Sequence, residues 1–239
     1  MLAFIRVFII VSYSITVSLL ALVFCLFRPR HPNNAVIFGR ILSVLTPVLG
    51  LRVVTRVPAS IKNLGSCVYI GNHQSNYDVL MYSCIVPSGT VSVGKKSLLW
   101  VPFFGLMYWA TGNVLLDRKN SAKARSTIDQ IADQIKQRNL SIWMFPEGTR
   151  SQGRGLLPFK MGAFHAAIAA KVPVVAVCMS ETYQQIKLNR WNNGTVILEM
   201  LEPISTENYT ADRVRELAAK CHRQMEDKYQ ALTEEKLSM

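Results

Sequence analysis

A histidine and an aspartate five residues apart, His73 and Asp78, are the pair in this chain best suited to proton transfer. An imidazole whose tautomer is fixed by a carboxylate keeps its far nitrogen free as a base near neutral pH. Residues five apart point about 140° away from each other in a regular helix, so the two side chains meet only if His73 lies in a turn and Asp78 in the first helical turn. The alternative is that Asn76 or Asp78 caps the helix and His73 is an incidental loop residue.

A second polar motif, Phe145–Ser151, follows another apolar run and combines a carboxylate, a glycine and an arginine in Glu147, Gly148 and Arg150. Glycine lets a backbone N–H approach a ligand closely, and arginine offers a planar, permanently charged fork for phosphate. The motif therefore indicates an anion-binding turn. An ordinary turn with a surface ion pair would contain the same residue types.

Further cations follow two other apolar runs. Lys95 and Lys96 precede the apolar and aromatic segment Leu98–Gly105, a combination that suits an anionic headgroup with an apolar tail. Arg118 closes another predicted strand, after Leu115-Leu116-Asp117, and the alternative is that Asp117 simply neutralises it there. The alternative for the lysine pair is a solvated charge run beside core residues.

The apolar pattern predicts the elements that place these groups. Strands are predicted at Arg52–Arg56, Val68–Ile70, Thr90–Val93, Asn113–Leu116, Ser141–Phe145, Val172–Cys178 and Thr195–Met200, and helices at Tyr77–Ile85, Ala122–Arg138, Ala163–Ala170 and Ala211–Leu232. Apolar strands that alternate with amphipathic helices indicate an α/β fold with a mostly parallel central sheet flanked by helices. Ligands of such sheets bind beyond the carboxyl ends of the strands, where His73 and Glu147 are expected.

Composition limits the classes of partner. The 239 residues are 50% hydrophobic, which is enough for one α/β domain with an N-terminal addition. The formal net charge of the chain is +12. The excess of basic residues suits nucleic acid, an anionic lipid surface or a phosphorylated substrate. Nucleic acid is the weaker candidate because no binding motif of that kind is present. The five cysteines have no paired spacing, which indicates a reducing compartment and no structural zinc.

The N-terminal segment Val7–Phe27 is an uncharged stretch of 21 residues, long enough to cross a hydrocarbon core of ~30 Å. It has no signal-peptide cleavage pattern, so we expect a membrane anchor, with Arg28 and the residues after it on the cytoplasmic side. A second apolar run, Ile41–Leu51, is too short to span and is expected to return into or lie along the interface. The alternative is that both are buried core helices. We expect residues 1–51 to form N-terminal membrane-anchoring helices and residues 52–239 the catalytic domain.

These motifs occur in a definite order along the chain. They are Asn72-His73 with Asp78, Gly94-Lys95-Lys96, Leu116-Asp117-Arg118, Phe145–Ser151 and Val172-Pro173-Val174. Their order and spacing resemble the motif set of the glycerolipid acyltransferases. The resemblance is greatest to the bacterial members that acylate 1-acylglycerol-3-phosphate, and it extends over nearly the whole chain.

The resemblance implies an enzyme that transfers a fatty acyl group from acyl-CoA or acyl carrier protein to the sn-2 hydroxyl of 1-acylglycerol-3-phosphate (lysophosphatidic acid). The product would be phosphatidic acid, made for phospholipid biosynthesis at the cytoplasmic face of the bacterial inner membrane. His73 and Asp78 are the expected catalytic residues. The expected substrate-binding residues are Glu147, Gly148, Thr149, Arg150, Lys95, Lys96 and Arg118. The expected partners are the two substrates and membrane lipid, with no nucleic acid, no metal and no cofactor beyond the acyl thioester co-substrate.

Finer roles come from the same resemblance. Glu147 is expected to order the acceptor hydroxyls or its own loop, and the Gly148 N–H is a candidate oxyanion donor. Aromatic and Met side chains at 98–109 are candidates for an acyl channel, with core packing the expectation for most of them. No Gly-x-Ser-x-Gly elbow is present, which favours direct transfer over a serine acyl-enzyme. The alternatives are another lysolipid or glycerol-3-phosphate as acceptor, an acyl-thioester hydrolase, and a non-catalytic lipid-binding protein.

Overall fold

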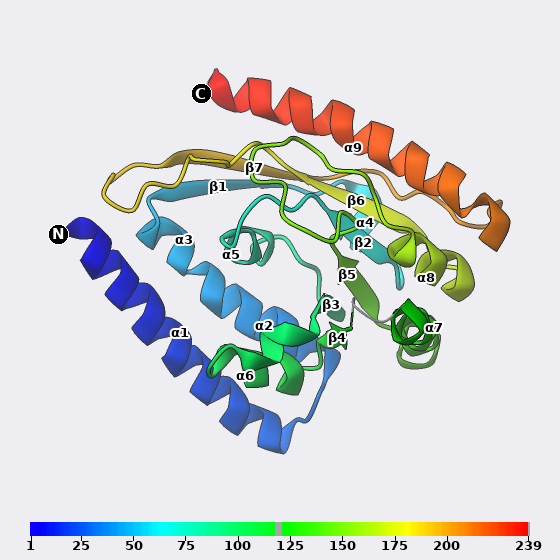
Figure 1. Ribbon diagram of the computed structural model, residues 1–239, viewed down its shortest axis with the longest axis horizontal. Coiled ribbons are helices and arrows are strands. Elements are labelled where there is room, and N and C mark those ends of the chain that lie inside the picture. The colour runs from blue at the N-terminus through cyan, green and yellow to red at the C-terminus, as the bar shows by residue number, and fades with distance from the viewer. Residues whose placement is uncertain (118–120, 239) are drawn as a thin grey trace.

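The computed structural model describes residues 1–117 and 121–238, with side chains described for all of these except 121–125 (Figure 1). In these residues seven strands form one sheet in the order β1-β7-β6-β2-β5-β3-β4. The strands are β1 Leu51–Arg56, β2 Val68–Gly71, β3 Thr90–Lys95, β4 Val114–Leu116, β5 Ser141–Met144, β6 Val174–Met179 and β7 Gly194–Met200. All neighbouring strands are parallel except β6 and β7, which run antiparallel. The predicted α/β fold with a mostly parallel sheet is confirmed, and the predicted strand ends differ by one or two residues.

Helices cover both faces of the sheet. The helices are α1 Leu2–Phe27, α2 Pro32–Ser43, α3 Leu45–Val48, α4 Ala59–Lys62, α5 Asp78–Tyr82, α6 Phe104–Ala110, α7 Ser121–Arg138, α8 Gly162–Ala170 and α9 Val214–Leu237, with 3-10 turns η1 Lys96–Trp100 and η2 Ala211–Arg213. Figure 1 shows α7, α8 and α9 on one face and α1, α2, α3, α5 and α6 on the other. Each residue of β2, β5 and β6 is buried, as expected for strands covered on both sides.

The side chains of the central strands alternate between two hydrophobic cores. On β5, Ile142 and Met144 pack with α7, α8 and α9, whereas Trp143 packs with the helices of the opposite face. On β2, Tyr69 joins Trp143 and stacks on it with ring centroids 5.8 Å apart. Among the described residues, the backbone of the sheet lies between these two cores.

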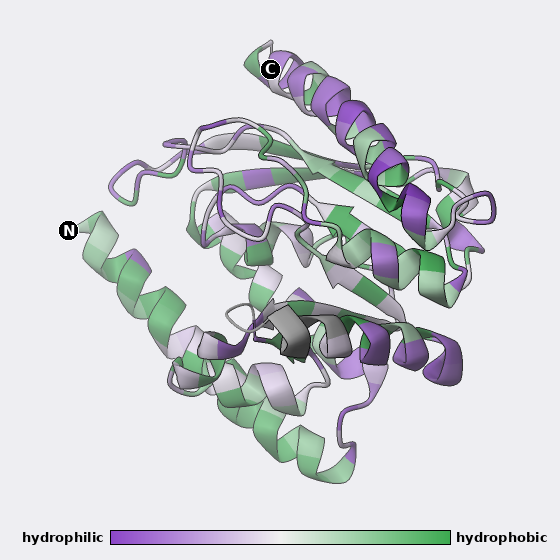
Figure 2. Cartoon of the chain, turned by 45° about the vertical axis from the view of Figure 1, so that its right-hand side comes forward, coloured by the Kyte–Doolittle hydropathy of each residue, from purple (hydrophilic) through white to green (hydrophobic). Residues whose placement is uncertain are grey.

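The N-terminal helix α1 is long and apolar enough to cross a membrane, and only 17% of its most apolar window is buried. It begins before the predicted Val7 and includes Arg6, whose side chain is buried. The residues Val17, Ala21 and Cys25 are buried on one side of the helix, which packs against α2, α3 and α6. Other apolar side chains of the helix, among them Phe4, Phe8 and Leu20, are exposed. The green colour in Figure 2 shows that the helix is apolar along most of its length.

The second apolar run has one buried face. Leu42, Leu45 and Leu49 are buried in the same core as Trp143, while Val44 on the other side is exposed. One face of Ile41–Leu51 thus packs on the core, as in the alternative of buried helices, and the prediction that the run lies along the interface stays a prediction. The run has helical periodicity, and the sheet covers one side of it. The division at residues 51 and 52 stays a prediction.

Candidate active site

The chain leaves β2 through a segment that is tied to the neighbouring strand β6. The Asn72 side chain donates to the Met179 carbonyl at 2.9 Å and accepts from the Met179 N–H at 2.8 Å. The Tyr82 hydroxyl donates to Asn72 as well, at 2.7 Å from its side-chain oxygen. These bonds fix the backbone immediately before His73.

Asp78 begins α5 and reaches back to His73. Its Oδ2 lies 2.7 Å from Nδ1 of His73, so the contact predicted from a turn followed by a first helical turn is present. The Asp78 carboxylate is fully buried and also accepts hydrogen bonds from the backbone N–H groups of Gln74 and Ser75 and from the Ser75 hydroxyl. An ionised carboxylate only accepts, so the Nδ1 position of His73 carries the proton and Nε2 has a free lone pair.

The His73 ring lies in a partly open position. It stacks on Phe145 with ring centroids 4.3 Å apart and an angle of 17° between the planes, and its side chain is 25% exposed. In the part of the chain that the structure describes, no hydrogen bond is made by Nε2. A base held on one side and open on the other is suited to take a proton from a bound ligand.

Glu147 connects three segments around this base. Its carboxylate is 3% exposed and accepts hydrogen bonds from the backbone N–H of His73 at 2.7 Å and of Leu157 at 3.0 Å. Burial raises the pKa of Glu147 to about 7, against the opposing effect of these two N–H groups. Of its two predicted roles, the contacts match the ordering of the loop.

Gly148 lies in a tight turn. Its N–H donates to the Phe145 carbonyl at 3.0 Å, and its role as an oxyanion donor stays a prediction. Its backbone has φ +68°, and a Cβ added there would lie 2.9 Å from Cδ and 3.0 Å from Nζ of Lys160. Gly148 therefore leaves room for the Lys160 side chain to cross the turn after β5.

Lys160 was not identified from the sequence. Its backbone N–H donates to the Pro146 carbonyl at 2.8 Å, which folds the segment after Leu157 back over the motif. Among the described residues, no carboxylate lies within ion-pair distance of its ammonium group. Lys160 lies ten residues beyond Arg150 and belongs to no motif in the sequence. The fold-back of the chain brings it next to Gly148.

The predicted cations are distributed along one edge of the sheet. The Arg150 guanidinium donates to the Asn76 side chain, which joins the two motifs, and Thr149 is exposed next to it. Lys95 and Lys96 are exposed at the end of β3, which neighbours β5, and Lys96 lies 3.9 Å from Asp117. Arg118 lies outside the described residues. The structure thus brings the motifs of His73 and Arg150 together and places the lysine pair one strand beyond β5.

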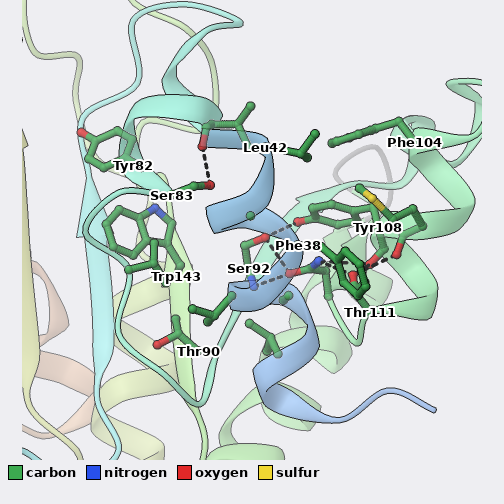
Figure 3. A pocket seen from close by; sticks show the side chains of 18 of the residues that line it. Phe38, Leu42, Tyr82, Ser83, Thr90, Ser92, Phe104, Tyr108, Thr111 and Trp143 are labelled. Carbon is green, nitrogen blue, oxygen red and sulfur yellow. Dashed lines mark hydrogen bonds between the residues drawn. The ribbon is translucent and has the colours of Figure 1, made fainter. Parts of the chain in front are cut away.

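A cavity of about 110 Å³ lies behind the histidine, between α2, α5, α6 and the strands β3 and β5 (Figure 3). Phe145 lines this cavity and stacks on His73, so the cavity and the base share one aromatic ring. Phe38, Leu42 and Phe104 give it apolar walls, and the Ser92 and Tyr108 hydroxyls are hydrogen-bonded at 2.7 Å on one side. A partly open apolar space of this kind suits part of a hydrocarbon chain.

The aromatic segment at 98–109 divides between the cavity and the surface. Phe104, Met107 and Tyr108 line the cavity. Trp100, Phe103 and Trp109 are exposed and are not packed in the core. No group of three or more His, Cys, Asp or Glu side chains able to hold a metal ion occurs in the described residues.

Comparison with known proteins shows the family. Residues 52–180 match the family model described as Acyltransferase. The chain is 54% identical over 235 residues to the 1-acyl-sn-glycerol-3-phosphate acyltransferases of Salmonella typhimurium and of Escherichia coli, covering 98% of this chain and 96% of each relative. It is 34% identical to the human 1-acyl-sn-glycerol-3-phosphate acyltransferase alpha, over 87% of this chain and 74% of the relative.

A solved structure has the same fold. The crystal structure of the 1-acyl-sn-glycerophosphate (LPA) acyltransferase PlsC from Thermotoga maritima superimposes with a TM-score of 0.73 at 22% identity, covering 97% of this chain and 94% of that one. The family model, the full-length identity and the ordered motifs at one sheet edge lead to the same conclusion. The chain belongs to the acyltransferase family.

Proposed function

We propose that this protein transfers an acyl group from acyl-CoA or acyl carrier protein to the sn-2 hydroxyl of 1-acylglycerol-3-phosphate, forming phosphatidic acid for phospholipid biosynthesis. The names of the relatives at 54% identity support this acceptor. The single observation that carries the chemistry is the His73 Nδ1 to Asp78 Oδ2 contact of 2.7 Å, which leaves Nε2 open beside an apolar cavity.

In the proposed reaction His73 is the general base and Asp78 its positioning partner. Nε2 removes the proton of the sn-2 hydroxyl, whose oxygen attacks the thioester carbonyl. The resulting tetrahedral intermediate expels the thiolate, which takes the proton back from the imidazolium. Asp78 stabilises the imidazolium while it exists, because the buried carboxylate is 2.7 Å away. The thioester is already activated, so this sequence of steps needs no cofactor.

The acceptor phosphate is assigned to the cations at the carboxyl edge. Arg150 offers a bidentate fork, and its contact with Asn76 holds it near the His73 turn. Lys160 crosses the same turn at Gly148, so we add it to the proposed set. Thr149, Lys95, Lys96 and Arg118 complete the proposed binding residues, and Glu147 orders the loop that carries Arg150.

The acyl chain is assigned to the cavity beside Phe145. Its walls come from α2, α5 and α6, and α2 and α6 also contact α1. A chain that enters from the lipid side would therefore pass between helices that are themselves next to the membrane. This arrangement keeps the thioester carbonyl near His73 while the hydrocarbon remains away from water.

For the membrane geometry, we propose that α1 lies in one leaflet at the cytoplasmic face of the bacterial inner membrane. Its start is fixed to the loop after β6 by Arg6, and the Asn34 side chain donates to the Arg28 carbonyl just after its end. The loop after β6 is bonded to the start of α1, so a bilayer-crossing α1 would draw this loop into the hydrocarbon region. Backbone polar groups of an irregular loop would have no hydrogen-bond partners there. The exposed Trp109 lies on α6, which packs against α1, and suits the headgroup region.

The test uses purified full-length protein in mixed micelles with radiolabelled acyl-CoA or acyl carrier protein and a panel of acceptors. The expected result is labelled phosphatidic acid from 1-acylglycerol-3-phosphate, with little free fatty acid. Transfer to glycerol-3-phosphate or another lysolipid in preference would replace the proposed acceptor. Release of free fatty acid without transfer would show an acyl-thioester hydrolase instead.

A further inference from the structure

The loop of residues 180–193, between β6 and β7, lies at the same sheet edge as His73. The antiparallel step from β6 to β7 places the loop at the carboxyl end of β6, next to the carboxyl end of β2. The Gln74 side chain, adjacent to His73, accepts from the Thr182 N–H at 2.7 Å and donates to the Ser180 carbonyl at 3.0 Å. The base of the loop is therefore joined directly to the proposed catalytic turn.

The tip of this loop is joined to the start of α1. The Arg6 guanidinium donates to the carbonyls of Leu188 at 3.0 Å, Arg190 at 2.5 Å and Trp191 at 2.9 Å, and the Ala3 N–H donates to the Asn189 side chain at 2.9 Å. Figures 1 and 2 both show the loop beside the N-terminus of α1. The loop tip and the beginning of the apolar helix thus form one continuous surface.

The groups exposed on this surface are aromatic and basic. Trp191 is 78% exposed, and Lys187 and Arg190 are exposed within four residues of it. The one acidic residue of the loop, Glu181, is at its base, where its carboxylate accepts from the Tyr183 N–H at 2.7 Å and from the Tyr229 hydroxyl. On the neighbouring helix Phe4 and Phe8 are exposed. An indole and two cations beside an apolar helix face match the headgroup layer of an anionic bilayer.

We propose that the tip of the 180–193 loop is a second membrane-contacting element, which binds anionic lipid headgroups next to α1. Trp191 enters the headgroup layer and Lys187 and Arg190 lie against lipid phosphates. Because the base of the loop holds Gln74, this contact sets the height of the catalytic turn above the lipid surface. The proposal rests on the proposed function in one respect, namely that α1 itself lies on the membrane.

The test follows the environment of the loop tip in the full chain. A single cysteine carrying a nitrobenzoxadiazole label is introduced as Trp191→Cys in a Cys84→Ser background, since the other four cysteines are buried. Phe8→Cys on α1 is the membrane control. Glu207→Cys, an exposed site beyond β7 at the opposite sheet edge, is the solvent control. Each labelled protein is bound to phosphatidylcholine vesicles with and without phosphatidylglycerol.

The expected result is a blue-shifted emission at positions 8 and 191, quenched by lipid carrying a nitroxide near the headgroup, and no change at position 207. Lys187→Gln should lower the ratio of inserted to non-inserted label at position 191 about fivefold on the anionic vesicles, the effect of one basic charge near such a surface. A label at 191 that stays in water while the label at 8 enters lipid would overturn the proposal. So would a blue shift at 191 that depends on protein concentration and not on lipid, because a second copy of the chain would then cover the tip.

Activity of the same proteins separates this proposal from the proposed function. Trp191→Ala combined with Lys187→Gln should raise the apparent KM for 1-acylglycerol-3-phosphate in vesicles several-fold and leave it unchanged in detergent micelles. If the double variant transfers the acyl group and its apparent KM in vesicles is unchanged, the role of the loop is rejected but the proposed function is not. Absence of transfer by the unaltered protein would reject the proposed function, while the label would still report whether the tip meets lipid.

Discussion

His73 and Asp78 meet because the backbone between them folds as a turn. The carboxylate of Asp78 accepts from the N–H groups of Gln74 and Ser75 as well as from the imidazole, so one buried group orders the whole turn. These hydrogen bonds to the Asp78 carboxylate are formed without a bound ligand. The imidazole is therefore oriented before any substrate binds, which lowers the cost of reaching the reactive arrangement.

His73→Ala should reduce acyl transfer by about 10²- to 10⁴-fold, the usual contribution of general-base catalysis. The Asp78 carboxylate keeps its backbone donors in this variant, so the fold and membrane association should be retained. Transfer is measured with labelled thioester, and vesicle flotation confirms membrane association. His165→Ala, on the exposed side of α8, is the matched control and should leave the rate unchanged. A His73→Ala rate close to that of the control would remove the proposed base.

Glu147 gives a prediction on pH and stability. Its pKa is raised from 4.5 to about 7 in the folded protein, so between these values the folded state holds a proton that the unfolded chain has released. The free energy of unfolding should therefore fall as pH rises through this window, by up to about 3 kcal/mol at 1.36 kcal/mol per pH unit.

Glu147→Gln should remove this slope, since an amide does not titrate. The measurement is the unfolding free energy of both proteins in micelles from pH 4.5 to 7.5, and Glu207→Gln at the surface is the control that should keep the slope. Parallel curves for the unaltered protein and Glu147→Gln would contradict the predicted titration.

Two glycines in the segment after β5, Gly148 and Gly155, have different surroundings. Gly148 and Gly155 both have left-handed backbones, with φ +68° and +70°, but only Gly148 faces a neighbouring side chain, that of Lys160. The two positions form a matched pair, because alanine would strain the backbone equally at both. Any difference between them reports the displacement of Lys160.

Gly155→Ala should cost about 1–2 kcal/mol of stability and leave the kinetics unchanged. Gly148→Ala should cost at least as much and also raise the KM for the acceptor phosphate, because an added Cβ would lie 2.9 Å from Cδ of Lys160. Steady-state kinetics of the two variants provide the comparison. Equal acceptor KM values would argue against Lys160 as a phosphate ligand.

The sequence predicted strands that are buried along their whole length better than it predicted short helices. The β6 run is apolar at every position and was predicted within two residues. The helix α6 was missed because seven residues are too few for periodicity, and it forms where Gly105 packs against the backbone of Leu98 and Leu99. His73 and Glu147 were singled out because they lie just after predicted strands. Lys160 was missed because its position depends on a long-range fold-back.

For the whole molecule, Arg6 determines how the N-terminal helix is joined to the rest. Arg6→Met keeps a long side chain in α1 but removes the guanidinium, which leaves the carbonyls of Leu188, Arg190 and Trp191 without their donor. Amide hydrogen exchange in residues 187–193 should accelerate about tenfold or more, since one charge-assisted bond contributes about 1.5–3 kcal/mol. Arg40→Met, which removes a single bond of 3.3 Å to the Val86 carbonyl, is the control and should leave this exchange unaltered. Unchanged exchange in Arg6→Met would show that the loop holds its shape without the helix.

The alternation of side chains along β5 has a practical consequence for protein engineering. Trp143 faces the compartment that contains the cavity, whereas its neighbours Ile142 and Met144 face the compartment under α7, α8 and α9. Selectivity for donor length and resistance to heat can therefore be optimised in separate mutant libraries, one for each side of the sheet, and the best members of each combined with little interference.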